Sequence, residues 1–191
     1  MMIDHSKENN IEGLFTLIGV RATIARKDAK KSIDIISERL NKKTGSSKTS
    51  KTPIYGGHIE NFKELCLQAE RFSQQEFGCG VKQPLIHNYG SKYREVLKYV
   101  GEDSSFGQEI DVTGVIRAEV IHAVREEMAV KLQDVLFRRT ELGTGENPGR
   151  RAIEISAELM AGELAWSQQK TADEIEEVSD IFMSKGPWQL E

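Results

Sequence analysis

The chain has 191 residues and a formal net charge of −4, with 38% apolar and 29% charged residues. This composition excludes collagen-like, mucin-like and fully disordered chains, because enough surface can be buried to offset the loss of chain entropy. The acidic balance argues against a dedicated nucleic-acid binder, whose affinity would come from neutralising phosphates. The length suits one domain with a core, or one domain with an appendage.

The start of the chain is polar and lacks the apolar stretch of a secretion signal, which predicts an intracellular protein. The longest nearly apolar run, residues 13–20, is far shorter than the roughly 20 residues that cross a bilayer. Cys66 and Cys79 are expected to be two thiols in a reducing compartment, with a single disulfide as the open alternative. The histidines show no metal-ligand spacing, so no metal site is predicted.

A buried strand is predicted at residues 11–18, where a short run rich in Ile, Leu and Phe is closed by Gly19. A helix is predicted over residues 22–42, because the apolar spacing changes there to one helical stripe, formed by Ala25, Ala29, Ile33, Ile36 and Leu40. A lone apolar strand with free edges is unstable. Its partner strands are therefore expected in another copy or in upstream residues, as in a truncated protein.

Residues 43–53 have the Gly, Ser, Thr, Lys and Pro content of a flexible linker, which separates residues 1–42 from a helical part, residues 54–191. The fold class is therefore mainly α. Apolar stripes in the helical part predict helices at residues 59–72, at residues 85–100 with a break at Gly90, and at residues 116–136.

Two more helices have start signals. Asn147 is expected to be an N-cap, with Pro148 in the first turn of the helix that follows. Thr171 and Glu174 have the spacing of a capping box at the start of the last helix. Residues 118–140, which overlap the predicted helix at residues 116–136, carry charged residues among the apolar positions. This mixture predicts an ion-pair network between helices, with a substrate or partner site as the alternative.

The usual catalytic signatures are absent from the sequence. Two near matches to the dinucleotide fingerprint, at residues 78–80 and 143–145, lack the third glycine and a preceding strand, so both are interpreted as turns. The segment Gly19 to Thr23 is the one place where chemistry is expected. A strand that turns into a helix presents free N–H groups and the positive helix end to an anion, and Arg21 adds a cation. An ordinary turn with an exposed arginine is the alternative.

Several segments resemble the FAD-dependent glycerol-3-phosphate dehydrogenases. GLFTLIGVRATIAR is similar to the last strand-to-helix segment of their flavin domain, where the pattern is close to GL-x-T-x-x-G-G-K-x-T-T-x-R. The segments PIYGG, LIHNYGSKYREVL, IRAEVIHAVREEMAVKLQDVLFRRTELGT and ELMAGELAWSQQKTADEIEEV resemble their helical carboxy-terminal domain. The resemblance covers nearly all of residues 11–185.

Within the first of these segments, Gly19 falls on the first glycine of the family turn, Arg21 on its lysine and Thr23 on its first threonine; Arg26 falls on its arginine. The family lysine lies near flavin and substrate, so the resemblance implies a cofactor contact from Gly19, Arg21, Ala22 and Thr23. Val20 replaces the second glycine and Ile24 the second threonine. An arginine in place of a lysine exchanges a point charge for a planar fork, so the substrate is open to question.

The resemblance implies that residues 1–42 are the end of an FAD-binding domain and that the intact enzyme oxidises sn-glycerol 3-phosphate to dihydroxyacetone phosphate. Implied partners are the upstream FAD and substrate domain of the same polypeptide, glycerol 3-phosphate, and a quinone or other electron acceptor; a homo-oligomer stays open. The chain alone is expected to be inactive. The implied location is cytoplasmic, with peripheral attachment at the inner face of the cell membrane left open. The rival hypothesis is a helical protein-interaction module without catalysis of its own.

Overall fold

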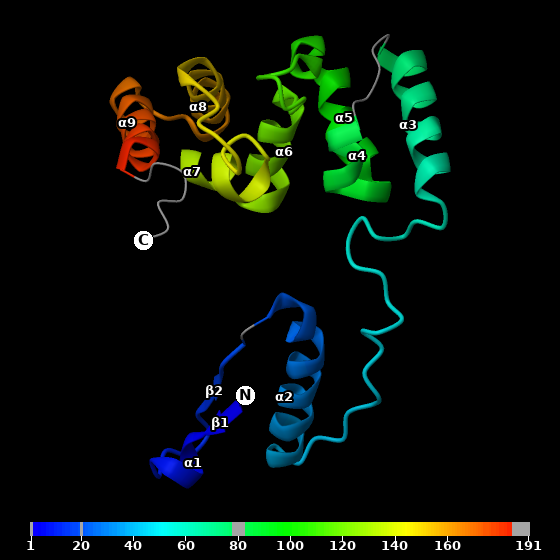
Figure 1. Ribbon diagram of the computed structural model, residues 1–191, viewed down its shortest axis with the longest axis vertical. Helices are drawn as coiled ribbons and strands as arrows, with labels where there is room; N and C mark the ends of the chain where they lie inside the picture. Colours follow the sequence, from blue (N-terminus) through cyan, green and yellow to red (C-terminus); the bar gives the residue numbers. More distant parts are fainter. Residues whose placement is uncertain (1, 20, 78–82, 185–191) are drawn as a thin grey trace. The chain divides into compact units, whose positions relative to one another are not determined.

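The computed structural model describes residues 2–19, 21–77 and 83–184, which fall into two compact units, Met1–Pro53 and Ile54–Glu191. The first unit contains β1 (Met2–Asp4), α1 (His5–Glu8), β2 (Phe15–Leu17), η1 (Ala22–Ile24) and α2 (Ala25–Arg39). The second unit contains α3 (Phe62–Phe77), α4 (Gln83–Tyr89), η2 (Gly90–Lys92), α5 (Tyr93–Glu102), η3 (Ser104–Gly107), α6 (Arg117–Glu127), α7 (Leu132–Asp134), η4 (Val135–Arg139), α8 (Arg150–Leu164) and α9 (Gln168–Ser184). The predicted mainly α-helical fold is confirmed (Figure 1).

The strand of the first unit is shorter than predicted, and it has a partner within the chain. β2 pairs antiparallel with β1, with Met2 opposite Leu17 and Asp4 opposite Phe15. The expectation that its partners lie in another copy or upstream was wrong for this edge of β2. β1 has only three residues in a polar segment, too few for an alternating pattern to reveal a strand. β2 is also not the buried strand that was predicted, because Thr16 and Leu17 are exposed.

The apolar stripe predicted for α2 is present but largely uncovered within the described residues of this unit. Ile33 is 57% exposed and Leu40 is 61% exposed, and Ile36 is half-buried. Of the described residues of the first unit, only Ser37 is buried. An amphipathic helix normally buries its apolar stripe against a core. The first unit therefore has an apolar surface rather than a core of its own.

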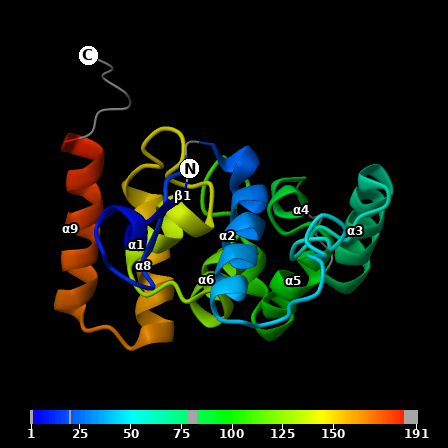
Figure 2. The same cartoon turned by 90° about the horizontal axis from the view of Figure 1, so that it is seen from below.

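The helices of the second unit lie in a row. α3 contacts α5, α5 contacts α6, α6 contacts α8 and α8 contacts α9. The same order is visible from two directions (Figures 1 and 2). α6 is the central helix, because it supplies Val120 and Ala123 to the apolar cluster shared with α8 and α9, and Ala118 and Ile121 to the cluster shared with α3, α4 and α5.

The predicted break at Gly90 is confirmed, and a second glycine explains it. Gly90 has φ +53°, and a Cβ atom there would lie 2.1 Å from the carbonyl oxygen of Gly56. Gly56 has φ +75°, and its own Cβ would lie 2.5 Å from the Tyr89 carbonyl oxygen. The Gly56 carbonyl accepts a hydrogen bond from the Ser91 N–H at 2.9 Å. The turn at the start of the second unit thus packs backbone to backbone on the α4–α5 junction, where a side chain would not fit.

The continuous helix predicted over residues 116–136 is interrupted. α6 ends at Glu127, and its C-cap Met128 adopts a left-handed conformation with φ 60°. The Ala129 N–H then donates to the Ala123 carbonyl at 3.0 Å. The Asp134 carboxylate accepts from the N–H groups of Val130 and Lys131, at 3.1 and 3.0 Å, before α7 begins. A left-handed methionine at a helix end leaves no sign in the apolar spacing, since glycine is the usual residue there.

The helix α8 begins later than predicted. Its N-cap is Gly149, with φ 86°, and Arg150 is the first helical residue. Asn147 does not cap the helix: its side-chain oxygen accepts the Gly149 N–H at 2.9 Å in the turn before the helix. Pro148 lies in that turn instead of the first helical turn. Asn and Pro favour turns as strongly as helix starts, and the turn is formed here.

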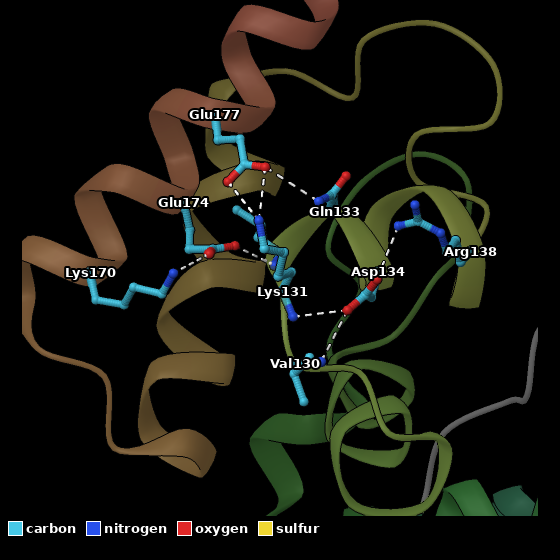
Figure 3. A network of polar contacts seen from close by, with 9 residues as sticks. Val130, Lys131, Gln133, Asp134, Arg138, Lys170, Glu174 and Glu177 are labelled. Carbon is cyan, nitrogen blue, oxygen red and sulfur yellow. Dashed lines mark hydrogen bonds and ion pairs between the residues drawn. The ribbon is translucent and has the colours of Figure 1, made fainter.

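The capping box predicted from Thr171 and Glu174 is wrong. α9 begins at Gln168, and the Ser167 hydroxyl accepts the Lys170 N–H at 3.1 Å. Glu174 is buried: its carboxylate accepts the Leu132 N–H at 2.8 Å and pairs at 2.5 Å with Nζ of Lys170, in the first turn of α9 (Figure 3). Tertiary packing therefore uses this carboxylate to cap α7, because the first N–H groups of a helix lack intrahelical partners.

Among the described residues, no helix is long and apolar enough to cross a membrane, and no group of three His, Cys, Asp or Glu residues could hold a metal ion. Cys66 is a free thiol. Cys79 lies outside the described residues, as does the turn predicted at residues 78–80.

Candidate functional site

The turn between β2 and α2 holds the residues expected to contact a cofactor, Gly19, Arg21, Ala22 and Thr23. Val20 lies outside the described residues. The backbone at Arg21 is extended, with φ −140° and ψ 132°, and the 3-10 helix η1 follows and runs directly into α2. The sequence therefore folds locally as a strand that ends, an exposed bend and a helix that begins. All four residues are exposed.

This turn exposes backbone N–H groups next to the Arg21 cation. The N–H groups of Ala22 and Thr23 precede the first bond of the 3-10 helix, from the Ile24 N–H to the Arg21 carbonyl at 3.2 Å. Groups at this place in a helix point outward without an intrahelical acceptor. The Arg21 side chain makes no cap hydrogen bond, and a Cβ on Gly19 would have no atom within 4 Å. A ligand or a protein surface can approach the turn.

Apolar side chains surround the turn. On the strand side, Leu17 and Ile18 are 49% and 42% exposed, and on the helix side Ile24 is 41% exposed. An exposed apolar patch rimmed by polar groups is typical of a surface that binds a ligand or a partner. The turn thus combines exposed backbone N–H donors, the Arg21 cation and exposed apolar side chains on both sides.

Arg39 at the end of α2 holds the hairpin in place. Its guanidinium pairs with Asp4, and it donates to the Ser6 hydroxyl at 2.9 Å and to Glu12 at 3.3 Å. It also lies 5.1 Å from the centre of the Phe15 ring. Hydrogen bonds from Ser6, together with the Arg39 charge, lower the pKa of Asp4. This clamp fixes β1 and β2 against the helix that carries the turn.

Residues 118–140 form the inter-helix ion pairs that the charge pattern predicted. Arg125 binds Glu163 of α8 with two hydrogen bonds, at 2.6 and 2.7 Å, and Glu102 of α5 at 2.7 Å. These bonds raise the pKa of Arg125, and the Arg125 bond lowers the pKa of Glu163. Lys98 of α5 pairs with Glu126 at 2.9 Å. Bidentate hydrogen bonds between arginine and a carboxylate are among the strongest side-chain contacts. These ion pairs therefore connect α6 to both α5 and α8.

Glu119 departs from that pattern and belongs to a buried polar cluster that the sequence did not reveal. It forms no ion pair with any described residue, and one oxygen accepts the Ile116 N–H at 2.9 Å. Its other oxygen, the Tyr89 hydroxyl and His122 Nδ1 are buried without a hydrogen-bond partner in the described structure. The Tyr89 and His122 rings are 5.3 Å apart. Only the packing of α4 on α6 brings these side chains together.

Burial dominates the protonation of this cluster. It raises the pKa of Glu119 to about 7, with added repulsion from Glu141 and Glu127. Hydrogen bonds from the Ile116 N–H and the Asn88 side chain oppose this rise. Burial likewise raises the pKa of the Tyr89 hydroxyl and lowers the pKa of His122. All three groups are therefore favoured in their neutral forms.

A family model and two curated proteins each match most of the chain. Residues 47–171 match the family model of the C-terminal domain of alpha-glycerophosphate oxidase. The chain is 26% identical over 175 residues to the probable mitochondrial glycerol-3-phosphate dehydrogenase of Dictyostelium discoideum, covering 90% of this chain and 27% of that protein. It is 26% identical over 179 residues to the aerobic glycerol-3-phosphate dehydrogenase of Bacillus subtilis, covering 89% of this chain and 32% of that protein.

A solved structure has the same fold. The X-ray structure of the glycerol-3-phosphate dehydrogenase from Bacillus halodurans complexed with FAD superposes with a TM-score of 0.75 at 23% identity, covering 94% of this chain and 37% of that one. The chain thus spans about a quarter to a third of the length of the curated relatives named above.

Proposed function

Because the chain belongs to the family of the C-terminal domain of alpha-glycerophosphate oxidase, we propose that it is the carboxy-terminal part of an FAD-dependent glycerol-3-phosphate dehydrogenase. The whole protein oxidises sn-glycerol 3-phosphate to dihydroxyacetone phosphate and passes electrons to a quinone or another acceptor. FAD supplies the hydride-accepting chemistry when bound, while the protein orients and tunes it.

The apolar surface of the first unit is the observation that carries this proposal. Leu17, Ile18 and Ile24 flank the turn, and Ile33 and Leu40 extend the apolar surface along α2. Each of these side chains is more than two-fifths exposed. A folded protein covers such a surface, since each buried apolar side chain contributes roughly 1.5–3 kcal/mol. An FAD-binding domain that continues the hairpin and packs on α2 provides that cover.

The turn offers groups that fit an anionic part of the flavin or the substrate phosphate. The N–H groups of Ala22 and Thr23 would donate to it, and the Arg21 guanidinium would form a charge-assisted hydrogen bond. Gly19 leaves the approach to these donors open. In this proposal the turn positions the bound anion, and it neither takes nor gives a proton, because arginine stays charged.

The test is the Arg21→Ala variant of the full-length enzyme. A charge-assisted hydrogen bond contributes about 1.5–3 kcal/mol, so kcat/KM for glycerol 3-phosphate should fall roughly 10- to 150-fold. Arg21→Lys should restore much of the loss, because it keeps the charge. Lys27→Ala, which removes an exposed cation from α2, the helix that follows the turn, is the matched control and should retain full activity.

Flavin content separates the outcomes of this test. A loss of rate with normal flavin absorbance supports a contact with the substrate, and a loss of both supports a contact with the cofactor. Full activity with normal flavin content in Arg21→Ala would contradict the role of the turn, and Arg21 would then be an ordinary surface residue.

A further inference from the structure

The turn at Gly19 to Thr23 has little in its described residues that fixes its shape locally. A Cβ on Gly19 would have no atom within 4 Å, and the Arg21 side chain makes no cap hydrogen bond. The backbone hydrogen bonds from the Ile24 and Ala25 N–H groups belong to the 3-10 helix that starts there. The directions of the free N–H groups therefore depend on the angle between the two elements that the turn joins, β2 and α2.

Apolar packing contributes little to that angle. Of the described residues of the first unit, only Ser37 is buried, and Leu17 of β2 is 49% exposed. A two-stranded hairpin is only marginally stable by itself in water. Contacts of polar and charged side chains must therefore contribute much of what orients the hairpin on α2.

One side chain supplies these contacts. In the described part of the unit, Arg39 of α2 makes every hydrogen bond, ion pair and cation–π contact between that helix and the hairpin. It pairs with Asp4 of β1, donates to the Ser6 hydroxyl at 2.9 Å and lies 5.1 Å from the centre of the Phe15 ring of β2. The Asp4 side chain is only 18% exposed, so solvent screens this ion pair less than an ordinary surface pair.

These contacts lie at the end of both elements that is farthest from the turn. Arg39 is the last of the 15 residues of α2, which is about 22 Å long at 1.5 Å per residue. Asp4 and Phe15 face each other in the register of the hairpin, where β2 begins. A contact at the far ends of two arms fixes the angle between them better than a contact near their junction, because a given displacement there changes the angle least.

We propose that Arg39 is a positioning residue for the turn: by joining the end of α2 to both strands, it keeps the Arg21 guanidinium and the neighbouring N–H groups directed at one bound anion. Arg39 does not touch the anion itself. This inference rests on the proposed function, in which the turn binds an anionic part of the flavin or the substrate phosphate. A site that has the competent geometry for only a fraction of the time binds more weakly by that fraction.

The first test is a double-mutant cycle in the full-length enzyme loaded with FAD. Arg39→Ala should lower kcat/KM for glycerol 3-phosphate roughly 2- to 12-fold, as expected for the loss of one hydrogen bond. Because Arg39 acts through Arg21, this factor should be smaller in an Arg21→Ala background, where the group to be positioned is absent. Lys30→Ala, which removes an ion pair with Asp34 within α2, is the matched control and should retain full activity.

Two further variants separate positioning from a loss of stability. Arg39→Lys keeps the charge and should restore part of the loss. Asp4→Asn removes the ion pair from the side of the hairpin, so it should reproduce a smaller loss even if Arg39→Ala fails to fold. An equal factor for Arg39→Ala with and without Arg21 would overturn the proposal. A raised KM at normal flavin content identifies the substrate phosphate as the bound anion, and loss of flavin identifies the cofactor.

The second test measures the turn itself and does not depend on activity. In the isotope-labelled 191-residue chain, the amide NMR signals of Ala22 and Thr23 should shift in Arg39→Ala and stay in place in Lys30→Ala. Position 39 lies at the other end of α2, so such shifts report a changed geometry and no direct contact. Unshifted signals would overturn the proposal. Shifted signals together with full activity in Arg21→Ala would contradict the proposed function and still support the role of Arg39 in placing the turn.

Discussion

The Glu119 side chain of the central helix α6 is buried, so the protonation of its carboxyl group should affect the free energy of unfolding. The folded chain keeps a proton there up to about pH 7, whereas an unfolded carboxyl releases it near 4.5. The stability from this group is therefore full below pH 4.5 and is lost as the pH rises through 7. Glu119→Gln should remove this loss while its amide oxygen still accepts the Ile116 N–H.

The measurement is urea unfolding of both proteins between about pH 5 and pH 8. The free energy of unfolding of Glu119→Gln, relative to the original chain, should rise over this range by at most about 3 kcal/mol. Burial lowers the pKa of His122, which acts in the opposite direction but is common to both proteins. A difference that does not change with pH would show that Glu119 is ionised in the folded chain.

At the scale of elements, two glycines join the start of the second unit to the α4–α5 junction. Gly90→Ala would place a Cβ 2.1 Å from the Gly56 carbonyl oxygen and add left-handed strain, so backbone must move. We expect a loss of about 2–4 kcal/mol in the free energy of unfolding. Gly162→Ala, in α8 with nothing within 4 Å of the new Cβ, should instead stabilise by about 0.5–1 kcal/mol. Similar midpoints for both variants would contradict this packing.

The start of α9 gives a second prediction at this scale. Because the Ser167 hydroxyl accepts the Lys170 N–H, Ser167→Ala should cost about 1 kcal/mol in thermal or urea unfolding. The Thr171 hydroxyl only donates to the Ser167 carbonyl, at 3.1 Å, within the first turn. Thr171→Ala should therefore cost less than Ser167→Ala, and the reverse order would place the helix start at Thr171.

The helices could be predicted from their apolar spacing, but several of their ends could not. The break at Gly90 was predictable because glycine favours a left-handed backbone. The break at Met128 was not, since this residue type carries no such preference. Glu174 has the right spacing for a local cap, yet packing α9 on α7 places its carboxylate on Leu132. Rules based on local sequence fail where a contact between residues distant in the sequence determines the position of a side chain.

At the scale of the molecule, the segment between the two predicted parts should be the first to be cleaved. Lys42, Lys43, Lys48 and Lys51 are exposed in a stretch without helix or strand. Brief trypsin digestion should cut there before it cuts residues 118–140, although that stretch also contains arginines. Mass spectrometry of the early fragments identifies the sites, and early cuts within residues 118–140 would contradict the packing of α6.

The two candidate sites differ in how far the sequence could predict them. The turn at Gly19 to Thr23 is local, so strand and helix patterns and the family resemblance locate it, and its role stays a prediction. The buried cluster of Tyr89, Glu119 and His122 is assembled from α4 and α6. Nothing in the spacing of Tyr89 and His122 marks them as neighbours. A site made from separated helices needs the tertiary structure.

The bond from the Leu132 N–H to Glu174 spans 42 residues, and this has a consequence for synthesis. At ~5–20 residues per second, a ribosome adds Glu174 roughly 2–8 s after Leu132. During that interval the nascent α7 lacks the Glu174 carboxylate that accepts the Leu132 N–H, and the Lys131 ammonium lacks its partner Glu177. The region around η4 should therefore reach its final form only after Glu174 and Glu177 have been translated, and a ribosome stalled before them would leave this region open to chaperones and proteases.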